Sequence, residues 1–162
     1  MPATTQYWID HLNLQPHPEG GYYKEVFRSV HQVTRAGEQA VKQACTSIYY
    51  LLEGKDFSGF HQLASDELWY FHKGAPLHIH VIDHEGTHTT IELSDSRTGS
   101  LQAVIPPNTW FAAEIPSATG FALVSCAVAP GFDFSEFEMA KKEELLIQFP
   151  QHANLLERLC RE

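Results

Sequence analysis

His61 and Glu67 are the two residues whose types and spacing are best suited to chemistry. Residues 60–63 and 67–72 are rich in apolar side chains and are separated by Ala64-Ser65-Asp66, a pattern typical of two strands joined by a tight polar turn. Because side chains alternate between the two faces of a strand, such a hairpin could bring His61 and Glu67 to one wall of a cavity. In apolar surroundings an imidazole and a carboxylate have shifted pKa values and can transfer protons or bind a metal.

The composition restricts the class of partner. The chain of 162 residues has 20 acidic and 11 basic side chains, a formal net charge of −9. This balance opposes binding to a phosphate backbone, so we expect no nucleic-acid partner. The three cysteines are far apart and form no CxxC pair, which favours a reducing compartment. No apolar run approaches membrane-spanning length. We therefore expect a cytoplasmic protein without a membrane segment.

The elements that must position His61 and Glu67 are predicted to be strands. About nine short runs of β-branched and aromatic residues alternate with Gly or Pro turns, which predicts an antiparallel sandwich or barrel. We expect a single domain over residues 1–162, with the barrel at about residues 20–131 and a helical cap over 133–162. Residues 33–42, which are polar and contain Gly37, predict a surface loop.

Helices are expected at the two ends of the chain. Thr4 or Thr5 could cap a short helix that runs through Leu14. The region from Asp133 onward has helical periodicity, and Pro150 separates its last helix from the one before. These helices would cover the barrel and leave its interior to the strands.

The stretch that holds His61 and Glu67 resembles the first motif of the cupin superfamily. That motif is a Gly, then His-x-His, then a Glu and finally a closing Gly. Here His61 matches the first His, Glu67 the Glu and Gly74 the closing Gly. Leu63 stands in the place of the second His. This departure puts the metal site of the superfamily in doubt for this chain.

Further segments resemble one cupin subfamily. The second cupin motif, roughly Pro-x-Gly-x-x-His, is similar to residues 106–111, where Asn108 replaces the Gly and Phe111 the metal-binding His. Asn is tolerable there because it accepts the left-handed backbone conformation. Residues 17–23, 65–69 and 128–134 resemble hallmarks of the cupin_5-type group, a family long classed as a domain of unknown function.

The resemblance implies an all-β fold and an interior pocket. The fold would be an antiparallel double-stranded β-helix, the jelly-roll or cupin barrel, with short N- and C-terminal helices. The group implies a homodimer whose pocket is similar to those of germin-like proteins, auxin-binding protein and sugar-nucleotide epimerases. It brings no assigned reaction.

The resemblance also bears on metal binding. Catalytic metal sites generally need about three protein ligands and an open position. With Leu63 and Phe111 in two ligand places, His61 and Glu67 alone would bind a metal weakly. His78 and His80 could add ligands if they faced the interior, but the alternation of residues 77–81 favours an outward position. We therefore expect no cofactor, with a divalent metal at His61 and Glu67 as the alternative.

Without a metal, His61 and Glu67 could act in acid–base catalysis. In this scheme His61 is the base, Glu67 orients or charges it, and a tyrosine is the acid. Epimerase-type cupins resemble the scheme, with a His as base and a Tyr as acid. The tyrosine candidates are Tyr22, Tyr49 and Tyr70, of which we choose Tyr49 as catalytic. Alternatively, Glu67 pairs with a cation such as Arg28 and only holds the barrel wall.

Seven further residues are predicted to contact a ligand, each with a simpler structural alternative. They are Glu19, Tyr22, Arg28, Ser65, Asp66, Trp69 and Trp110. The Gly-Gly that follows Glu19 could form a pocket lip or merely a turn. The two tryptophans could stack on a planar ring or belong to the core. Ser65 and Asp66 could simply make the turn, although Asp66 could also orient His61.

Three functions are compatible with these residues. The leading hypothesis is a metal-independent isomerase or epimerase that acts on a small polar or carbohydrate-like ligand in the barrel. The second is a metal-dependent oxygenase-like cupin. The third is a non-catalytic module that binds a small molecule, favoured by the apolar replacements Leu63 and Phe111.

Overall fold

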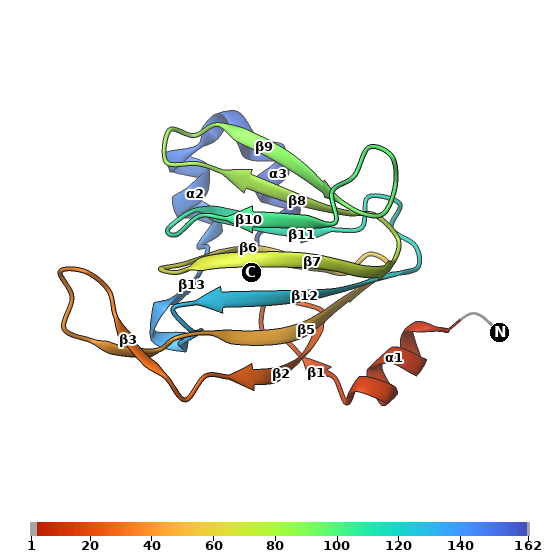
Figure 1. The fold of residues 1–162 in the computed structure, drawn as a ribbon. Helices are drawn as coiled ribbons and strands as arrows, with labels where there is room; N and C mark the ends of the chain where they lie inside the picture. The colour runs from red at the N-terminus through yellow and green to blue at the C-terminus, as the bar shows by residue number, and fades with distance from the viewer. Residues whose placement is uncertain (1–2, 162) are drawn as a thin grey trace.

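A computed structural model describes residues 3–161 and has two antiparallel β-sheets packed face to face (Figure 1). The six-stranded sheet contains, in spatial order, β1 (Gln15–Pro16), β2 (Tyr22–Arg28), β5 (Thr46–Glu53), β12 (Phe121–Ala129), β7 (Asp66–Gly74) and β10 (Gln102–Ile105). The five-stranded sheet contains β13 (Phe137–Met139), β6 (Phe57–Leu63), β11 (Trp110–Glu114), β8 (Leu77–Ile82) and β9 (His88–Leu93). The expected jelly-roll fold is thereby confirmed.

The main core lies between the two sheets, where the inward residues of both sheets meet. Trp69 of β7 packs edge-on against Phe111 of β11 and against Tyr50 of β5. All three side chains are almost completely buried. This aromatic centre closes one part of the barrel interior, so that a ligand cavity must lie elsewhere between the sheets.

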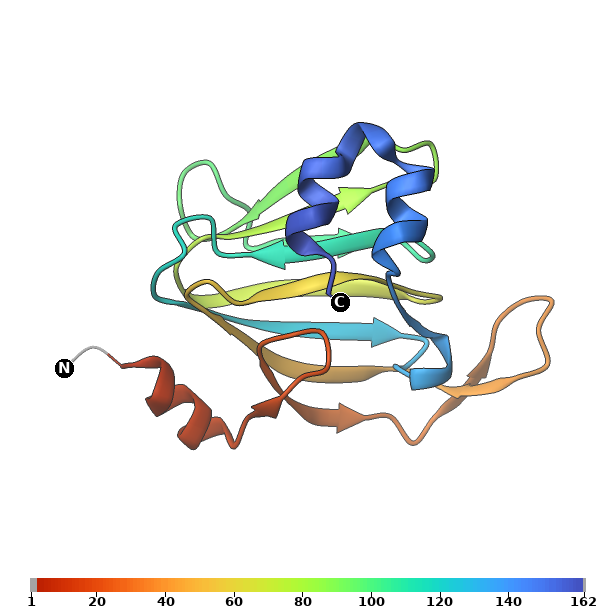
Figure 2. The ribbon, with the colours of Figure 1, turned by 180° about the vertical axis from the view of Figure 1, so that it is seen from behind.

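Short helices cover the outer faces of both sheets. The helix α1 (Thr5–Leu12) is capped by the Thr4 side chain and packs against the six-stranded sheet. The helices α2 (Lys142–Gln148) and α3 (Ala153–Leu159) lie on the outer face of the five-stranded sheet (Figure 2). Pro150 begins the short 3-10 helix η2 (Pro150–His152) between them. Among the described residues, no helix has the length and apolar character needed to cross a membrane.

Two segments differ from the expectations. Residues 33–42 are not simply a loop, because β3 (Gln32–Thr34) and β4 (Val41–Gln43) pair as an antiparallel hairpin. Residues 137–139 are not helical, because β13 pairs with the edge of β6 and satisfies its backbone there. Local periodicity cannot detect a pairing that depends on a distant strand. Asn108 adopts a left-handed conformation with φ of 55°, as its place in the motif predicts.

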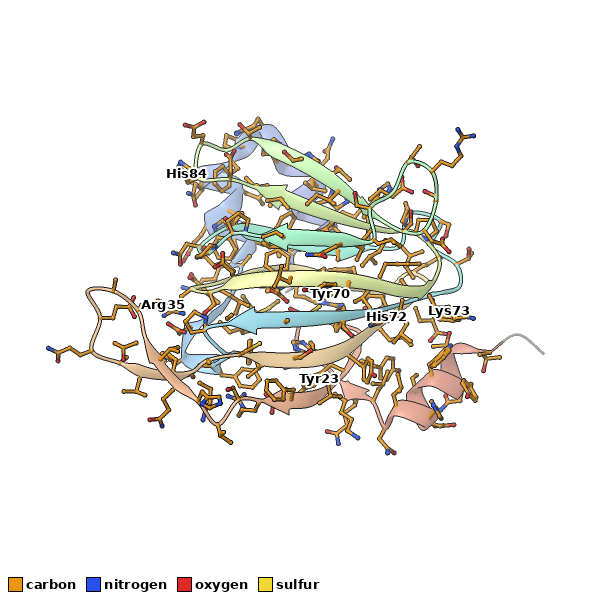
Figure 3. The ribbon with its side chains drawn as sticks, viewed as in Figure 1. Tyr23, Arg35, Tyr70, His72, Lys73 and His84 are labelled. Atoms are coloured by element: carbon orange, nitrogen blue, oxygen red, sulfur yellow. The ribbon has the colours of Figure 1, made fainter. Side chains whose placement is uncertain are left out.

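The β3–β4 hairpin projects from the body of the protein and is tied to the segment before β13 (Figure 1). Arg35 at its tip forms a bidentate ion pair with Glu136 of the 3-10 helix η1 (Phe134–Glu136), at 2.6 and 3.1 Å. Lys42 lies 3.1 Å from the carboxylate of Asp133. In Figure 3, Arg35 lies between the hairpin and the sheets. The hairpin therefore holds the segment 132–137 in place.

Candidate functional site

A cavity of about 350 Å³ lies between the two sheets at the end that segment 132–137 borders. Its inner part is built by polar residues of the loop before β2 and of β6 and β7. Its more exposed part combines apolar side chains, such as Phe134, with the charged Arg28 and Asp133. The described residues that line it are His17, Glu19, Tyr23, Glu25, Arg28, Thr46, Ile48, His61, Leu63, Glu67, Cys126, Val128, Phe132, Asp133, Phe134 and Phe137.

His61 is fixed by hydrogen bonds at both ring nitrogens. Its Nδ1 lies 2.7 Å from the carbonyl oxygen of Gly59, and its Nε2 lies 2.9 Å from Oε2 of Glu19. Both nitrogens thus face oxygen acceptors, which is the arrangement that suits a protonated imidazole. Burial lowers the pKa of His61, but the charge and hydrogen bond of Glu19 outweigh burial, so the pKa is raised overall.

Glu19 is the ionised partner in this buried pair. Burial alone would raise its pKa, but the charge and hydrogen bond of His61 lower the pKa below its ordinary value. His17 lies on the other side, with Nδ1 3.8 Å from Oε1 of Glu19. Because His17 Nδ1 accepts a hydrogen bond from the Glu19 backbone N–H, that nitrogen carries no proton in this arrangement. Burial lowers the pKa of His17, which also favours the neutral ring.

The loop that carries Glu19 needs glycine at position 20. Gly20 has φ of 107°, and a side chain there would collide with the guanidinium of Arg161 and the carbonyl of Phe57. Tyr50 donates a hydrogen bond to the Gly20 carbonyl at 2.6 Å. Arg161 donates to the Glu19 carbonyl at 3.2 Å. These contacts fix the backbone that aims the Glu19 carboxylate at His61.

Glu67 has the opposite electrostatic behaviour in the same cavity. Its side chain is buried on β7, and burial raises its pKa to about 8. The charge of His61 acts to lower this pKa, and that of Glu19 to raise it. Its Oε2 has no hydrogen-bond partner among residues 3–161. Glu67 is therefore largely a neutral carboxylic acid near pH 7, beside a carboxylate that stays ionised.

The structure places four of the predicted site residues at the cavity: His61, Glu67, Glu19 and Arg28. His61 and Glu67 do share one cavity, but the expected hairpin is wrong, because β6 and β7 belong to different sheets and the two side chains come from opposite walls. The roles differ, however, because Glu19 and not Glu67 pairs with His61. The alternative in which Arg28 pairs with Glu67 does not match the contacts either, since Arg28 binds Glu25.

The predicted tyrosines lie elsewhere. Tyr49 and Tyr22 pack with the cluster around Leu14 and α1, on the outer face of the six-stranded sheet. Tyr70 is not among the described residues that line the cavity, whereas Tyr23 is (Figure 3 labels both). The alternation along β5 explains the outcome for Tyr49, because its neighbours Ile48 and Tyr50 face the interior. Tyr49 therefore does not occupy the place of an acid beside His61.

The four remaining residues that were predicted to contact a ligand lie outside the cavity. Ser65 accepts a hydrogen bond from Arg35 at 2.5 Å. Asp66 is exposed at the start of β7. Trp69 belongs to the core, and Trp110 packs toward the C-terminal helices. None of these four is among the described residues that line the cavity.

Sequence reasoning missed His17 and the aromatic residues Phe132, Phe134 and Phe137 at the cavity. A signal for His17 was present, because the Gly-Gly after Glu19 marked a possible pocket lip. The aromatic residues lie between the strand β12 and the C-terminal helices. Their residue types alone indicate a role in packing. Their position depends on the β13 pairing and on the hairpin, which no local pattern indicates.

Comparisons with known proteins identify the family. The family model described as Cupin superfamily (DUF985), Cupin_5, matches residues 6–140. The chain belongs to this family. It is similar to a hypothetical protein from Leishmania major (35% identity, TM-score 0.90, covering 99% of this chain and 100% of that one). It is equally similar to protein SO0799 from Shewanella oneidensis (36% identity, TM-score 0.90, covering 98% of each chain).

Two further matches are more distant. The uncharacterized protein YML079W of Saccharomyces cerevisiae is 29% identical over 161 residues, which cover 90% of this chain and 79% of that protein. Oxalate decarboxylase from Bacillus subtilis shares the fold at 14% identity, with a TM-score of 0.55, over 89% of this chain and 36% of that one. At this identity the likeness extends to the fold alone.

The donor set does not fit the metal centre that cupin folds can hold. No group of three His, Cys, Asp or Glu side chains within residues 3–161 is arranged to bind a metal. His61 has both nitrogens engaged by protein oxygens, and Leu63 and Phe111 contribute no donor. His80 bonds to Glu114 and His88 instead.

Proposed function

We propose that this cupin is a metal-independent acid–base catalyst of the isomerase or epimerase kind, acting on a small molecule in the barrel cavity. Glu67 is the general acid and Glu19 the general base. His61 is a positioning residue that holds Glu19 ionised. The observation that carries the proposal is the pair of carboxyl groups in one cavity, one with a lowered pKa and the other with a pKa of about 8.

The chemistry follows from these protonation states. A neutral Glu67 can donate its proton, or a hydrogen bond, to a carbonyl oxygen of the substrate. That interaction makes the neighbouring C–H group more acidic. The Glu19 carboxylate can then accept the carbon-bound proton and return it to a different face or position. A pKa near 8 suits this role, because Glu67 can both lose and regain a proton near neutral pH.

Hydrogen–deuterium exchange tests this function with a panel of simple carbonyl compounds. The protein is incubated in D2O with aldoses, ketoses and α-hydroxy ketones, and deuterium at carbon is followed by NMR. We expect exchange next to a carbonyl group with at least one compound. Glu67→Gln and Glu19→Gln should each slow it by roughly 100-fold or more. The exposed Glu53 provides the control variant Glu53→Gln, which should exchange at the wild-type rate. Absence of exchange, or full exchange by both site variants, contradicts the proposal.

A non-catalytic binding module is the second candidate. The observation in its favour is that both nitrogens of His61 already bond to the protein and leave none for a substrate. In that case a bound compound would show no deuterium exchange, and Glu67→Gln would change affinity alone.

A further inference from the structure

Arg28 is a cation at the cavity wall, yet its hydrogen-bonding capacity is already used. A guanidinium has five N–H donors. In Arg28, Nε and Nη2 donate to the two carboxylate oxygens of Glu25 at 3.3 and 2.6 Å. Nη1 donates to the Gln43 side chain at 3.3 Å, and both Nη1 and Nη2 reach the Phe132 carbonyl at 3.2 Å. These five contacts leave Arg28 no donor for an anionic ligand.

The other charges at the wall are balanced in the same way. Asp133 lies 3.1 Å from Lys42 and accepts a hydrogen bond from the Ser135 backbone at 2.9 Å. Deeper in the cavity, Glu19 neutralises His61. Glu67 contributes either no charge or a negative one. Among the described lining residues, no positive charge is left for a ligand to neutralise.

Apolar side chains make up much of the remaining wall. They are Ile48, Leu63, Val128, Phe132, Phe134 and Phe137. Phe132 packs edge-on against Phe134 and contacts Phe137, so the aromatic side chains form one surface at the outer part of the cavity. Such a surface favours an apolar or ring-shaped part of a ligand, because water is released when the two meet.

We propose that the cavity selects an uncharged small molecule, whose apolar or ring face lies on Phe132, Phe134 and Phe137 and whose hydrogen-bonding oxygen meets Glu67. Carboxylates and phosphate esters are rejected, since Arg28 cannot pair with them unless it gives up Glu25. The inference rests on the proposed function in taking this cavity as the substrate site. It excludes dicarboxylic acids and sugar nucleotides as the substrate class.

Binding of charge-matched probes tests the selection. Benzamide, benzoate and benzamidine share one ring and differ in charge, and glucose, glucuronate and glucosamine do the same for a sugar. Ligand-observed NMR titrations give an affinity for each. We expect a neutral member of at least one set to bind about tenfold or more tightly than its charged counterparts. Tighter binding of an anion or a cation, or binding of none of the six, overturns the proposal.

A variant that frees Arg28 makes the test specific. Glu25→Ala removes the acceptor of two Arg28 donors and leaves an unneutralised cation at the wall. We expect benzoate affinity to rise about tenfold, with benzamide affinity nearly unchanged. Glu38 pairs with Arg35 and does not line the cavity, so Glu38→Ala is the matched control. If Glu25→Ala leaves benzoate binding unaltered, Arg28 does not set the selection.

These measurements separate the inference from the proposed function. The probe titrations contain no turnover, whereas the exchange experiment needs it. Selective binding of neutral probes without deuterium exchange leaves the ligand class standing and removes the catalytic role. Deuterium exchange in a carboxylate or a phosphate ester leaves the catalytic role standing and removes the uncharged ligand class.

Discussion

At the level of single residues, one imidazole and the local burial place two carboxyl groups in opposite protonation states. Glu19 has a direct hydrogen bond to His61 and stays ionised. Glu67 feels the charge of His61 but makes no such bond, so burial prevails and raises its pKa to about 8. The difference between the two acids therefore depends on which of them the backbone brings into contact with the imidazole.

This difference predicts an unusual pH dependence of stability. Between the ordinary pKa of 4.5 and the folded value of about 8, folded Glu67 holds a proton that the unfolded chain releases. The contribution of Glu67 to the free energy of unfolding is therefore greatest below pH 4.5 and decreases as the pH rises to about 8. The slope is about 1.4 kcal/mol per pH unit at most.

Urea unfolding of wild type and Glu67→Gln at several pH values in this window measures the effect. The wild-type stability should decrease relative to the variant as the pH rises, because glutamine cannot titrate. Glu85 is exposed, and Glu85→Gln should show no such trend. A difference between wild type and Glu67→Gln that is independent of pH would mean that Glu67 titrates normally.

The pairing of His61 and Glu67 with one cavity could be predicted because it is local. The two residues lie on consecutive strands, β6 and β7, which belong to different sheets, and each side chain points into the space between the sheets. The partner of His61 could not be predicted, since Glu19 reaches it from a loop on a separate part of the chain. The position of Tyr49 outside the cavity could not be predicted for a related reason: which residues of β5 face the cavity depends on the neighbours of β5 in the sheet.

At the level of elements, the β3–β4 hairpin and η1 act together. The Arg35–Glu136 ion pair is about four-fifths buried on both sides, with side-chain exposures of 18%. Arg35 also donates to Ser65. A partly buried, bidentate pair contributes more than an exposed one, because water screens it less. The aromatic surface of the cavity is thus held in place by a contact outside the cavity.

Arg35→Ala should therefore loosen segment 132–139 without unfolding the barrel. We expect faster hydrogen–deuterium exchange in that segment and a loss of about 1–2 kcal/mol in the free energy of unfolding. Mass spectrometry of the exchanged peptides gives the location of the effect. Arg97 is exposed in the loop before β10, so Arg97→Ala is the control. Unchanged exchange in residues 132–139 would show that the hairpin does not hold this segment.

Neither the β3–β4 hairpin nor the strand β13 could be predicted from the sequence. Residues 32–43 are polar and mostly exposed, so their composition indicates a loop equally well. The short β13 has no extended apolar pattern and becomes a strand by pairing with β6. In contrast, the strands β5 and β12 are long and apolar, and their own residues indicate them.

At the level of the whole molecule, we propose that the protein is a homodimer. Six of the ten large apolar side chains that are exposed among the described residues lie on or beside the β2–β4 region. They are Val26, Phe27, Val30, Val33, Val41 and Phe134. An apolar surface concentrated in one region is typical of an interface between proteins.

Light scattering coupled to size-exclusion chromatography should give about twice the mass of one chain. The double variant Val30→Lys/Val41→Lys should shift the protein toward the monomer, because it places charges on the proposed interface. Val30 is 87% exposed and Val41 59% exposed, so neither substitution disturbs the core. Leu101, which is 62% exposed near β10, provides the control Leu101→Lys. A monomeric wild type would contradict the proposal.

The architecture as a whole was the most predictable level. Turn residues, alternating strands and two partial motifs together indicate a jelly roll, and many independent signals agree on it. The site depends on a few contacts, and one change of partner alters its chemistry.

One such contact joins residues 142 positions apart, where Arg161 holds the carbonyl of Glu19. A growing polypeptide on the ribosome can form most of the barrel while that arginine has not yet been synthesised. Glu19 would then lack its final support, and the imidazole beside it would lack a fixed counter-ion. The orientation of Glu19 should therefore be fixed only after the strands of the barrel have been synthesised.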